Sequence, residues 1–262
     1  MGAETRLLCD ARGNLPREYV FEDGVPAELE ALLDEPAPGD VPYQCLLVRT
    51  ADAVVLVDTG LGAVEHPFGV SGGRLTAELE GLGVAPYVID VVVLTHGHLD
   101  HVGGSVRAGA PAFPNARYVM PRLDWETFTS EAELAEMSAT SAAVSREQLP
   151  PLAAAGVLDL ADAETEVAPG VLMIPAPGHT LGHMAVEVAG ELLYLADALL
   201  DEIQAARPEL GHGLDSDAEA AAATLRALLG RAVQHDLPVA CAHLKGVFRV
   251  EPAAGAYRLA PA

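Results

Sequence analysis

Three histidines and one aspartate lie within six consecutive residues, His96-Gly97-His98-Leu99-Asp100-His101, directly after the apolar run Val91–Leu94. Turns at the ends of buried strands often carry binding and catalytic side chains, because a rigid sheet fixes their positions. Imidazole and carboxylate ligands without thiolate suit zinc first, and manganese, cobalt or iron are also admissible. The types and spacing of these residues therefore predict a metal centre at the end of a strand.

The segment THGHLDH resembles the H-x-H-x-D-H signature of the metallo-β-lactamase superfamily. That family needs a later histidine, then an aspartate at a strand end, then a final histidine. The segments PAPGHTLGHM, LLYLADAL and VACAHLKG offer His179, Asp197 and His243 in that order. The resemblance runs from about Gln44 to the C-terminus. It implies an α/β fold, the αββα four-layer sandwich of two mixed β-sheets flanked by helices.

The resemblance also implies two zinc ions per chain, with manganese, cobalt or iron as alternatives. It assigns seven ligands: His96, His98 and His179 to the first metal, Asp100, His101 and His243 to the second, and Asp197 as the bridge between them. Two cations a few ångströms apart can share a hydroxide, because they lower the pKa of bound water from about 16 to about 7. We expect the catalytic residue Asp100 to orient this nucleophile and to pass its proton to the leaving group.

The elements that must position these residues follow from hydrophobic patterns. Strands are predicted over Gln44–Arg49, Ala53–Asp58, Val88–Leu94, Ala116–Pro121, Pro169–His179, His183–Gly190, Glu191–Asp197, Leu237–Leu244 and Phe248–Leu259. Helices are predicted around Leu75–Leu82, over much of Arg122–Ala155, and from Ser216 to Asp236 with Ser216 as the cap. The chain has no Ser/Gly linker, fixed-period repeat or low-complexity tract, so we expect one metallo-β-lactamase-like domain over residues 1–262.

Charge and composition restrict the partners and the compartment. The chain carries 15 basic and 38 acidic residues, a formal net charge of −23, which would repel nucleic acid and anionic lipid. We interpret this charge as favouring solubility. No stretch reaches the roughly 18 uncharged apolar residues of a membrane span, and no signal peptide is apparent. The three cysteines lack disulfide-framework or C-x-x-C spacing, which favours the reducing cytoplasm.

Other polar residues have two readings each. Asp58 falls where such proteins carry a strand-end aspartate, and it is expected either to accept a hydrogen bond from a ligand histidine or simply to cap a strand. His183 could contact the substrate or a metal ligand, but it is interpreted as starting a strand without a further role. Cys241 should face the same side of its strand as His243, but it is expected to be a small buried core residue. The remaining histidines match no motif position and are expected to lie away from the site: His66, His212 and His235.

Departures from the family pattern narrow the activity. His98 stands where redox di-iron members carry glutamate, and Asp197 stands where β-lactam-cleaving members carry cysteine or serine. Small lactonases and organophosphate or ester hydrolases remain, a branch that the segment Phe113–Trp125 also resembles. Lactonases of this fold place a tyrosine three residues after the bridging aspartate, where this chain has Leu200.

The segment 122–155 is a candidate wall or lid over the metals. Trp125, Phe128 and Met137 are either pocket-lining or core residues of this segment, and helical spacing favours the core.

The leading hypothesis is a lactonase-like hydrolase that cleaves a lactone, an ester, a related acyl bond or a phosphotriester of a small molecule. One alternative is a mononuclear iron dioxygenase acting on a persulfide, which uses a subset of the same ligands. The other is a non-catalytic, metal-stabilised binding protein. The sequence leaves open whether the chain forms a homodimer.

Overall fold

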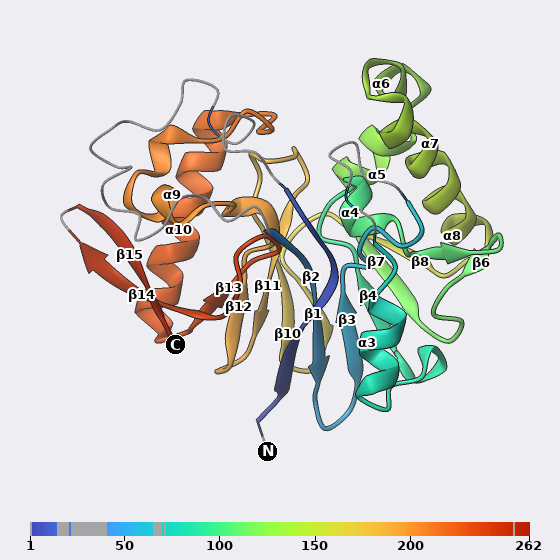
Figure 1. Ribbon diagram of the computed structural model, residues 1–262, viewed down its shortest axis with the longest axis horizontal. Helices are drawn as coiled ribbons and strands as arrows, with labels where there is room; N and C mark the ends of the chain where they lie inside the picture. The colour runs from blue at the N-terminus through green and yellow to red at the C-terminus, as the bar shows by residue number, and fades with distance from the viewer. Residues whose placement is uncertain (1, 15–20, 22–40, 65–69, 71, 254) are drawn as a thin grey trace.

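The computed structural model describes residues 2–14, 21, 41–64, 70, 72–253 and 255–262. Two β-sheets lie face to face, and helices cover the outer face of each (Figure 1). This arrangement confirms the predicted αββα class. The first sheet has the order β1(Glu4–Gly13), β2(Val41–Arg49), β3(Val54–Val57), β4(Val91–Val93), β7(Arg117–Pro121) and β8(Leu158–Ala161).

The second sheet has the order β15(Ala256–Pro261), β14(Phe248–Ala253), β13(Val239–Ala240), β12(Leu192–Tyr194), β11(Met184–Val188), β10(Val171–Pro175) and β9(Thr165–Ala168). A small hairpin, β5(Val106–Arg107) with β6(Ala110–Pro111), lies apart from both sheets. Both large sheets mix antiparallel and parallel pairs: β3, β4, β7 and β8 run parallel in the first, and β12 and β13 in the second.

Helices divide between the two sides of the sandwich (Figure 1). The first sheet is covered by α3(Leu75–Gly81), α4(Leu99–Val102), α5(Arg122–Thr129), α7(Ala139–Gln148) and α8(Pro150–Ala154), whereas α6(Glu131–Glu136) packs against α5 and α7. The second is covered by α9(Glu202–Ala206) and α10(Ala218–His235). The described residues also form short 3-10 helices: η1(Pro86–Val88), η2(Ala196–Ala198) and η3(Pro208–Leu210).

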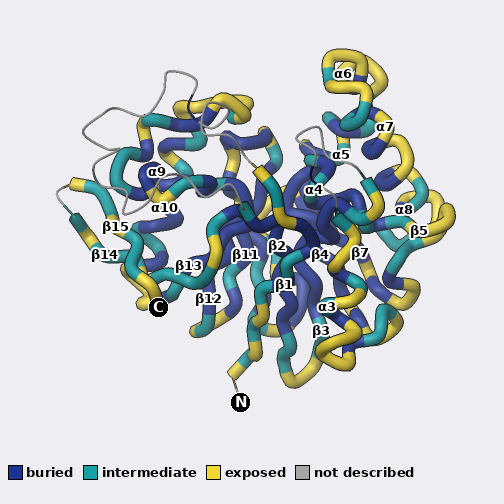
Figure 2. The backbone as a smooth tube through the Cα atoms, in the orientation of Figure 1, coloured by how far each residue is buried: buried dark blue, intermediate teal, exposed yellow. Residues whose placement is uncertain are grey.

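Three apolar clusters match the three interfaces between these layers. The central one joins the inner faces of both sheets, for example Val57 and Val93 with Val186. One outer cluster packs the first sheet against α3, α4, α5, α7 and α8, and a second outer cluster packs the second sheet against α9 and α10. Figure 2 shows the buried core running through the middle of the molecule. Because the central strands are buried on both faces, they appear in the sequence as continuous apolar runs.

The structure differs from the predicted strands in one boundary and in several strands at the sheet edges. The strand expected over Val88–Leu94 is only Val91–Val93, because Pro86–Val88 forms a 3-10 turn. Strands β1, β8 and β9 were not predicted. They lie at sheet edges, where one side of the strand is unpaired and charged side chains interrupt the apolar alternation.

The cap of α10 also differs from the prediction. Asp217, not Ser216, is the N-cap, and its side chain accepts a hydrogen bond from Ala220 N–H. The hydroxyl of Ser216 instead donates to the carbonyl oxygen of His179 at 3.0 Å. The helix start is therefore attached to a predicted ligand loop.

Asp10 joins the end of β1 to two loops. Its fully buried carboxylate accepts backbone N–H bonds from Leu61 and Gly62 at one oxygen and from Gly73 and Leu75 at the other. Buried N–H groups are costly when they lack an acceptor. This carboxylate therefore fixes the loop after β3 and the start of α3.

Replacement of Asp10 by alanine should lower the free energy of unfolding by at least about 3 kcal/mol, because four backbone N–H groups lose their acceptor. Urea denaturation followed by circular dichroism measures this change. The control Asp52→Ala, at an exposed turn residue, should change the free energy by less than about 0.5 kcal/mol. Equal stability of the Asp10 variant and the wild type would contradict this account of the loops.

Candidate metal centre

Parallel strands bring the THGHLDH segment to the edge where β3 and β4 end. Asp58 directly follows β3, and His96 lies three residues beyond β4. His98 is the N-cap residue of α4 with an extended backbone, and its ring makes no capping bond. Gly97 is required here, since a Cβ would lie 2.2 Å from the ring of Phe128. The turn therefore projects its side chains into one place.

The second sheet supplies the remaining predicted residues from the ends of its own strands. His179 lies in the loop after β10, Asp197 in η2 after β12, and His243 just after β13. The strand predicted over Leu237–Leu244 ends early, at Ala240. Gln44 explains why: its side-chain amide donates to the carbonyl oxygens of Cys241 and Leu244, at 3.0 and 2.8 Å. These bonds hold the turn that carries His243.

One group of potential ligands surrounds His98. Its Nδ1 lies 3.0 Å from Nε2 of His96 and 2.9 Å from Nε2 of His179. Oδ2 of Asp197 lies 3.9 Å from the His96 nitrogen and 3.5 Å from the His179 nitrogen. The four ligand atoms lie within 4.8 Å of one another, a spacing suited to one metal ion.

The other group surrounds Asp197 from the opposite side. Nε2 of His101 lies 3.2 Å from Oδ1 of Asp197 and 3.6 Å from Oδ2 of Asp100. Nε2 of His243 lies 3.4 Å from Oδ2 of each aspartate. The two groups share Asp197, so the structure brings all seven predicted side chains together.

Two atoms in this centre indicate that it fits a cation. His101 Nε2 and Asp197 Oδ1 are buried and make no hydrogen bond to the described residues. Buried polar atoms in proteins are normally hydrogen-bonded or coordinated to a metal. The nitrogen and oxygen donors therefore suit metal ions such as zinc, and these two atoms face the place where an ion would lie.

Electrostatics divides the histidines into two kinds. Burial lowers the pKa of His98 to about 3 and also lowers that of His96, so both rings stay neutral and keep a lone pair for a metal. Burial also disfavours the charged form of His243, but Asp197 and Asp100 outweigh it and raise its pKa to about 10. The neighbouring aspartates raise the pKa of His101 in the same way. Without a metal, protons on His101 and His243 therefore balance the two carboxylates of the second group, and a bound cation would take over that role.

Hydrogen bonds at the Nδ1 atoms, which face away from the centre, orient the rings of His101 and His243. Oδ2 of Asp58 lies 2.8 Å from Nδ1 of His101. Of the two interpretations of Asp58, the structure therefore favours the hydrogen bond to a ligand histidine. Asp58 also accepts hydrogen bonds from the backbone and side chain of Thr95. Nδ1 of His243 faces the carbonyl oxygen of Pro42 at 3.1 Å. These contacts leave Nε2 of each ring directed at the centre.

His183 has a role that the sequence reading missed. It is fully buried, its Nδ1 lies 3.1 Å from the carbonyl oxygen of Ala176, and its Nε2 accepts from the backbone N–H of Asp197 at 3.2 Å. The ring therefore holds the backbone of the shared aspartate. The interpretation of His183 as a residue without a role was wrong.

The expectation for the unassigned histidines was wrong for one of them. His212 is buried, and its Nε2 lies 3.2 Å from Nδ1 of His179. His235 is exposed at the end of α10, as expected. His66 lies outside the described residues. No spacing rule in the sequence relates His212 to the motif, because His212 lies between η3 and α10 and reaches His179 only after two strands and α9 have intervened.

Asp124 is the other residue that sequence reasoning missed. It lies in the first turn of α5, and its buried carboxylate accepts hydrogen bonds from Gly97 N–H, Thr180 hydroxyl and Gly182 N–H, at 2.8, 2.9 and 2.8 Å. Burial raises its pKa to about 6, against these donors, which lower it. Asp124 thus connects the loop of His96 and His98 to the loop of His179.

The candidate lid contributes one side chain to the centre. The ring of Phe128 packs edge-on against that of His98, with centroids 5.5 Å apart. Trp125 and Met137 are partly buried against the outer core of the first sheet, in agreement with the core reading. Leu200, three residues after Asp197, is buried. Cys241 is a buried core residue, as expected.

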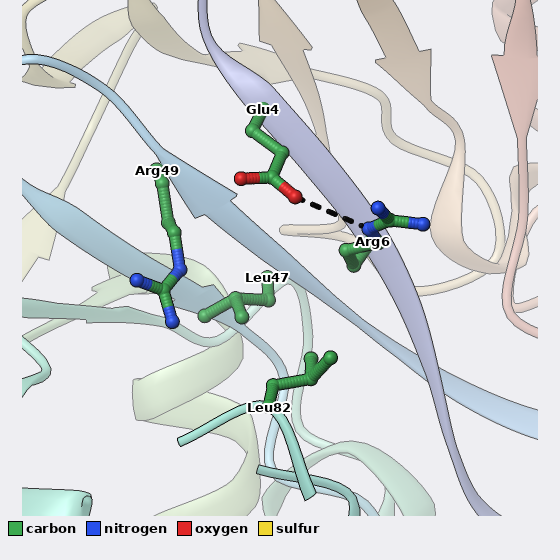
Figure 3. Close-up of a pocket in the computed structure, with 5 residues that line it drawn as sticks. All are labelled: Glu4, Arg6, Leu47, Arg49 and Leu82. Carbon is green, nitrogen blue, oxygen red and sulfur yellow. Dashed lines mark hydrogen bonds and ion pairs between the residues drawn. The ribbon is translucent and has the colours of Figure 1, made fainter. Parts of the chain in front are cut away.

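A surface pocket of about 250 Å³ lies at the other end of the first sheet (Figure 3). Its lining consists of Glu4, Arg6, Leu47, Arg49 and Leu82, with Arg6 paired to Glu4. Arg49 is the last residue of β2, whereas the metal centre lies where β3 and β4 end. The pocket has no histidine or cysteine and takes no part in the centre.

Within the described ranges, no helix is long and apolar enough to cross a lipid bilayer.

Comparison with known families identifies the sequence pattern. The profile of the Metallo-beta-lactamase superfamily matches residues 38–243, a range that contains all seven residues of the centre.

Curated relatives share part of the chain. An N-acyl homoserine lactonase of Bacillus sp is 28% identical over 180 residues, covering 61% of this chain and 64% of that protein. A probable metallo-hydrolase of Mycobacterium tuberculosis is 30% identical over 182 residues, covering 58% of this chain and 55% of that protein. The alignments thus span less than two thirds of these relatives.

Solved structures share the fold over almost the whole chain. The hydrolase AbOPH of the beta lactamase superfamily has a TM-score of 0.85 at 21% identity, covering 99% of this chain and 94% of that chain. AidC, described as a dizinc quorum-quenching lactonase, has a TM-score of 0.83 at 23% identity with the same coverage. At these low sequence identities, the structural similarity establishes the shared fold alone.

Replacement of Asp124 by asparagine should lower the free energy of unfolding by about 1–3 kcal/mol, because the amide turns a donor toward a buried donor. Urea denaturation of the metal-free protein measures the change. The matched control is Asp162→Asn, which alters an exposed ion pair with Arg122 and should change the free energy by less than about 1 kcal/mol. Similar values for the two variants would argue against Asp124 as a link between the loops.

Proposed function

The chain belongs to the metallo-beta-lactamase superfamily, and we propose that it is a metal-dependent hydrolase with a dinuclear zinc centre that cleaves a lactone, an ester or a related acyl bond. The observation that carries this proposal is the pair of ligand groups sharing Asp197. Support also comes from the N-acyl homoserine lactonase of Bacillus sp and from AidC, which is described as a dizinc lactonase. A phosphotriester is a further candidate substrate, because a metal pair can polarise a phosphoryl oxygen as well as a carbonyl oxygen.

Seven side chains would hold the two metals. We assign His96, His98 and His179 to the first, Asp100, His101 and His243 to the second, and Asp197 to both. When bound, a metal pair polarises a carbonyl or phosphoryl oxygen and makes water nucleophilic near neutral pH. The neutral rings of His96 and His98 present lone pairs without first losing a proton.

Asp100 is the proposed catalytic residue. Its side chain is 12% exposed, more than the other carboxylate of the centre, so one edge remains open to a substrate. Burial would raise its pKa, but His101 and His243 lower it, so the carboxylate is ionised and can accept a proton. It orients the attacking water, accepts its proton and passes that proton to the leaving group. Leu200 carries no hydroxyl, so Asp100 supplies this step without a tyrosine at that position.

The proposal also covers the substrate class, the compartment and the oligomeric state. The proposed substrate is a small molecule, because AidC is described in complex with the product N-hexnoyl-L-homoserine and because the net charge disfavours nucleic acid and anionic membranes. Cys9, Cys45 and Cys241 are unpaired, which supports the cytoplasm as the compartment. One domain over the full chain and a monomeric or homodimeric state stay predictions that domain mapping and solution mass measurements can test.

Metal content and hydrolysis together test the proposed function. Protein purified without added metal or chelator should contain close to two zinc ions per chain by elemental analysis and should hydrolyse at least one member of a lactone, aryl-ester and phosphotriester panel. An N-acyl homoserine lactone comes first in that panel. One iron per chain with oxygen uptake and no hydrolysis would favour the persulfide dioxygenase. Bound metal without turnover of any kind would favour a binding protein.

Two substitutions test the assigned roles. Asp100→Asn should lower kcat about 10²–10⁴-fold on the best substrate, because the proton acceptor is lost. His98→Ala should lower both metal content and kcat, because the first group loses its central nitrogen. Steady-state kinetics with parallel elemental analysis separates these effects, and the exposed variant Asp52→Asn serves as the control. Wild-type rates in both variants would contradict the dinuclear mechanism.

A further inference from the structure

A segment outside the motif, His212 to Asp215, contacts the edge of the His179 ring that faces away from the centre. Nε2 of His179 faces His98 at 2.9 Å, so its Nδ1 points away from the centre. This Nδ1 lies 3.2 Å from Nε2 of His212 and 3.5 Å from Oδ1 of Asp215. His212 Nε2 lies 2.9 Å from the same oxygen. All three side chains are at most 2% exposed, so two rings and one carboxylate meet in the interior.

The hydrogen bonds determine where the protons lie. Nδ1 of His212 accepts from the backbone N–H of Leu214 at 3.1 Å, so the proton of the neutral His212 ring is on Nε2. A metal on Nε2 of His179 leaves the proton of that ring on Nδ1. With both protons in place, His179 Nδ1 and His212 Nε2 are two donors 3.2 Å apart and cannot bond to each other. Oδ1 of Asp215, at 3.5 and 2.9 Å from these two nitrogens, is the nearby acceptor toward which both N–H groups can turn. The other oxygen of Asp215 accepts from the backbone N–H of His212 at 3.1 Å.

Backbone contacts hold the same loop independently of these side chains. Both N–H and hydroxyl of Ser216 donate to the carbonyl oxygen of His179 at 3.0 Å. The N–H of Asp217 donates to the carbonyl oxygen of Gly178 at 3.0 Å. Gly178 has a φ of +136°, and a Cβ there would lie 2.2 Å from the backbone nitrogen of Ala221. The start of α10 is thus packed directly against the residue before His179.

We propose that Asp215, assisted by His212, is a positioning residue that fixes the ring and tautomer of His179 for the first metal. This inference rests on the proposed function, because it requires a metal at His179. The geometry parallels Asp58 behind His101 in the second group. Each metal would then have one histidine ligand backed by a buried carboxylate, an arrangement that orients the ring and strengthens it as a ligand.

The test uses three variants that separate positioning from folding. Asp215→Asn retains an oxygen for the N–H of His212 but turns an amide toward the two rings. His212→Asn retains an acceptor near the position of Nδ1 for Leu214 N–H but removes Nε2. His212→Gln restores a polar group near the position of Nε2. The control Asp217→Asn changes a carboxylate two residues from Asp215 that caps α10 without touching His179, and asparagine caps a helix equally well.

Zinc affinity is measured by chelator competition on the full chain and repeated in the His243→Ala background, which isolates the first site. We expect Asp215→Asn and His212→Asn to weaken the first zinc about 10–100-fold. His212→Gln should recover part of that loss, and Asp217→Asn should stay within about 2-fold of the wild type. In the cobalt-substituted protein, Asp215→Asn should shift the NMR signal of the His179 Nδ1 proton and speed its exchange with water.

The outcomes separate this inference from the proposed function. A wild-type chain that binds no metal overturns both. A wild-type chain with two metals and turnover, whose Asp215→Asn and His212→Asn variants keep full affinity for the first zinc, overturns this inference alone. An equal loss of affinity at both sites in these variants also overturns it, since that pattern reports general destabilisation. Three metals per wild-type chain would overturn it too, because an ion would then replace the shared protons at Asp215.

Discussion

The burial of Asp197 between two groups of histidines is the constraint on which the site depends. Its side chain is 6% exposed, and Oδ1 has no hydrogen-bond partner among the described residues. Burial would raise its pKa, but His101 and His243 lower it, so the carboxylate stays ionised in the interior. A buried charge is stable only when it is paired or coordinated. The strand ends therefore have to bring positive or metal-binding partners to both of its oxygens.

The sandwich meets this requirement by joining the ends of two sheets. The strands β3 and β4 end beside each other in the first sheet, and β12 and β13 do so in the second. A direct bond crosses between the sheets where the backbone N–H of Met184 donates to the carbonyl oxygen of Thr95, at 3.0 Å. Close packing of the inner apolar faces holds the sheets in register.

Acidic residues do more in this protein than keep it soluble. Four buried aspartates, Asp10, Asp58, Asp124 and Asp215, each accept or face several N–H groups and join segments that are distant in sequence. Each carboxylate satisfies donors in loops that carry or adjoin the centre, where an unpaired donor would be costly. The net charge was interpreted as favouring solubility, and the structure adds that part of the negative charge lies inside and orders the site.

The sequence by itself indicated the fold class and the seven converging side chains through its resemblance to the metallo-β-lactamase superfamily. That resemblance can be read from sequence because the ligand residues keep a fixed order and spacing directly after apolar runs that form buried strands. Edge strands such as β1 and β9 escaped detection, since their burial depends on a neighbour that the pattern does not reveal. Only the tertiary structure decided the roles of Asp124, His183, His212 and Asp215. Each acts through a contact with a residue far along the chain, and the direction of a side chain across such a distance is set by packing, not by spacing.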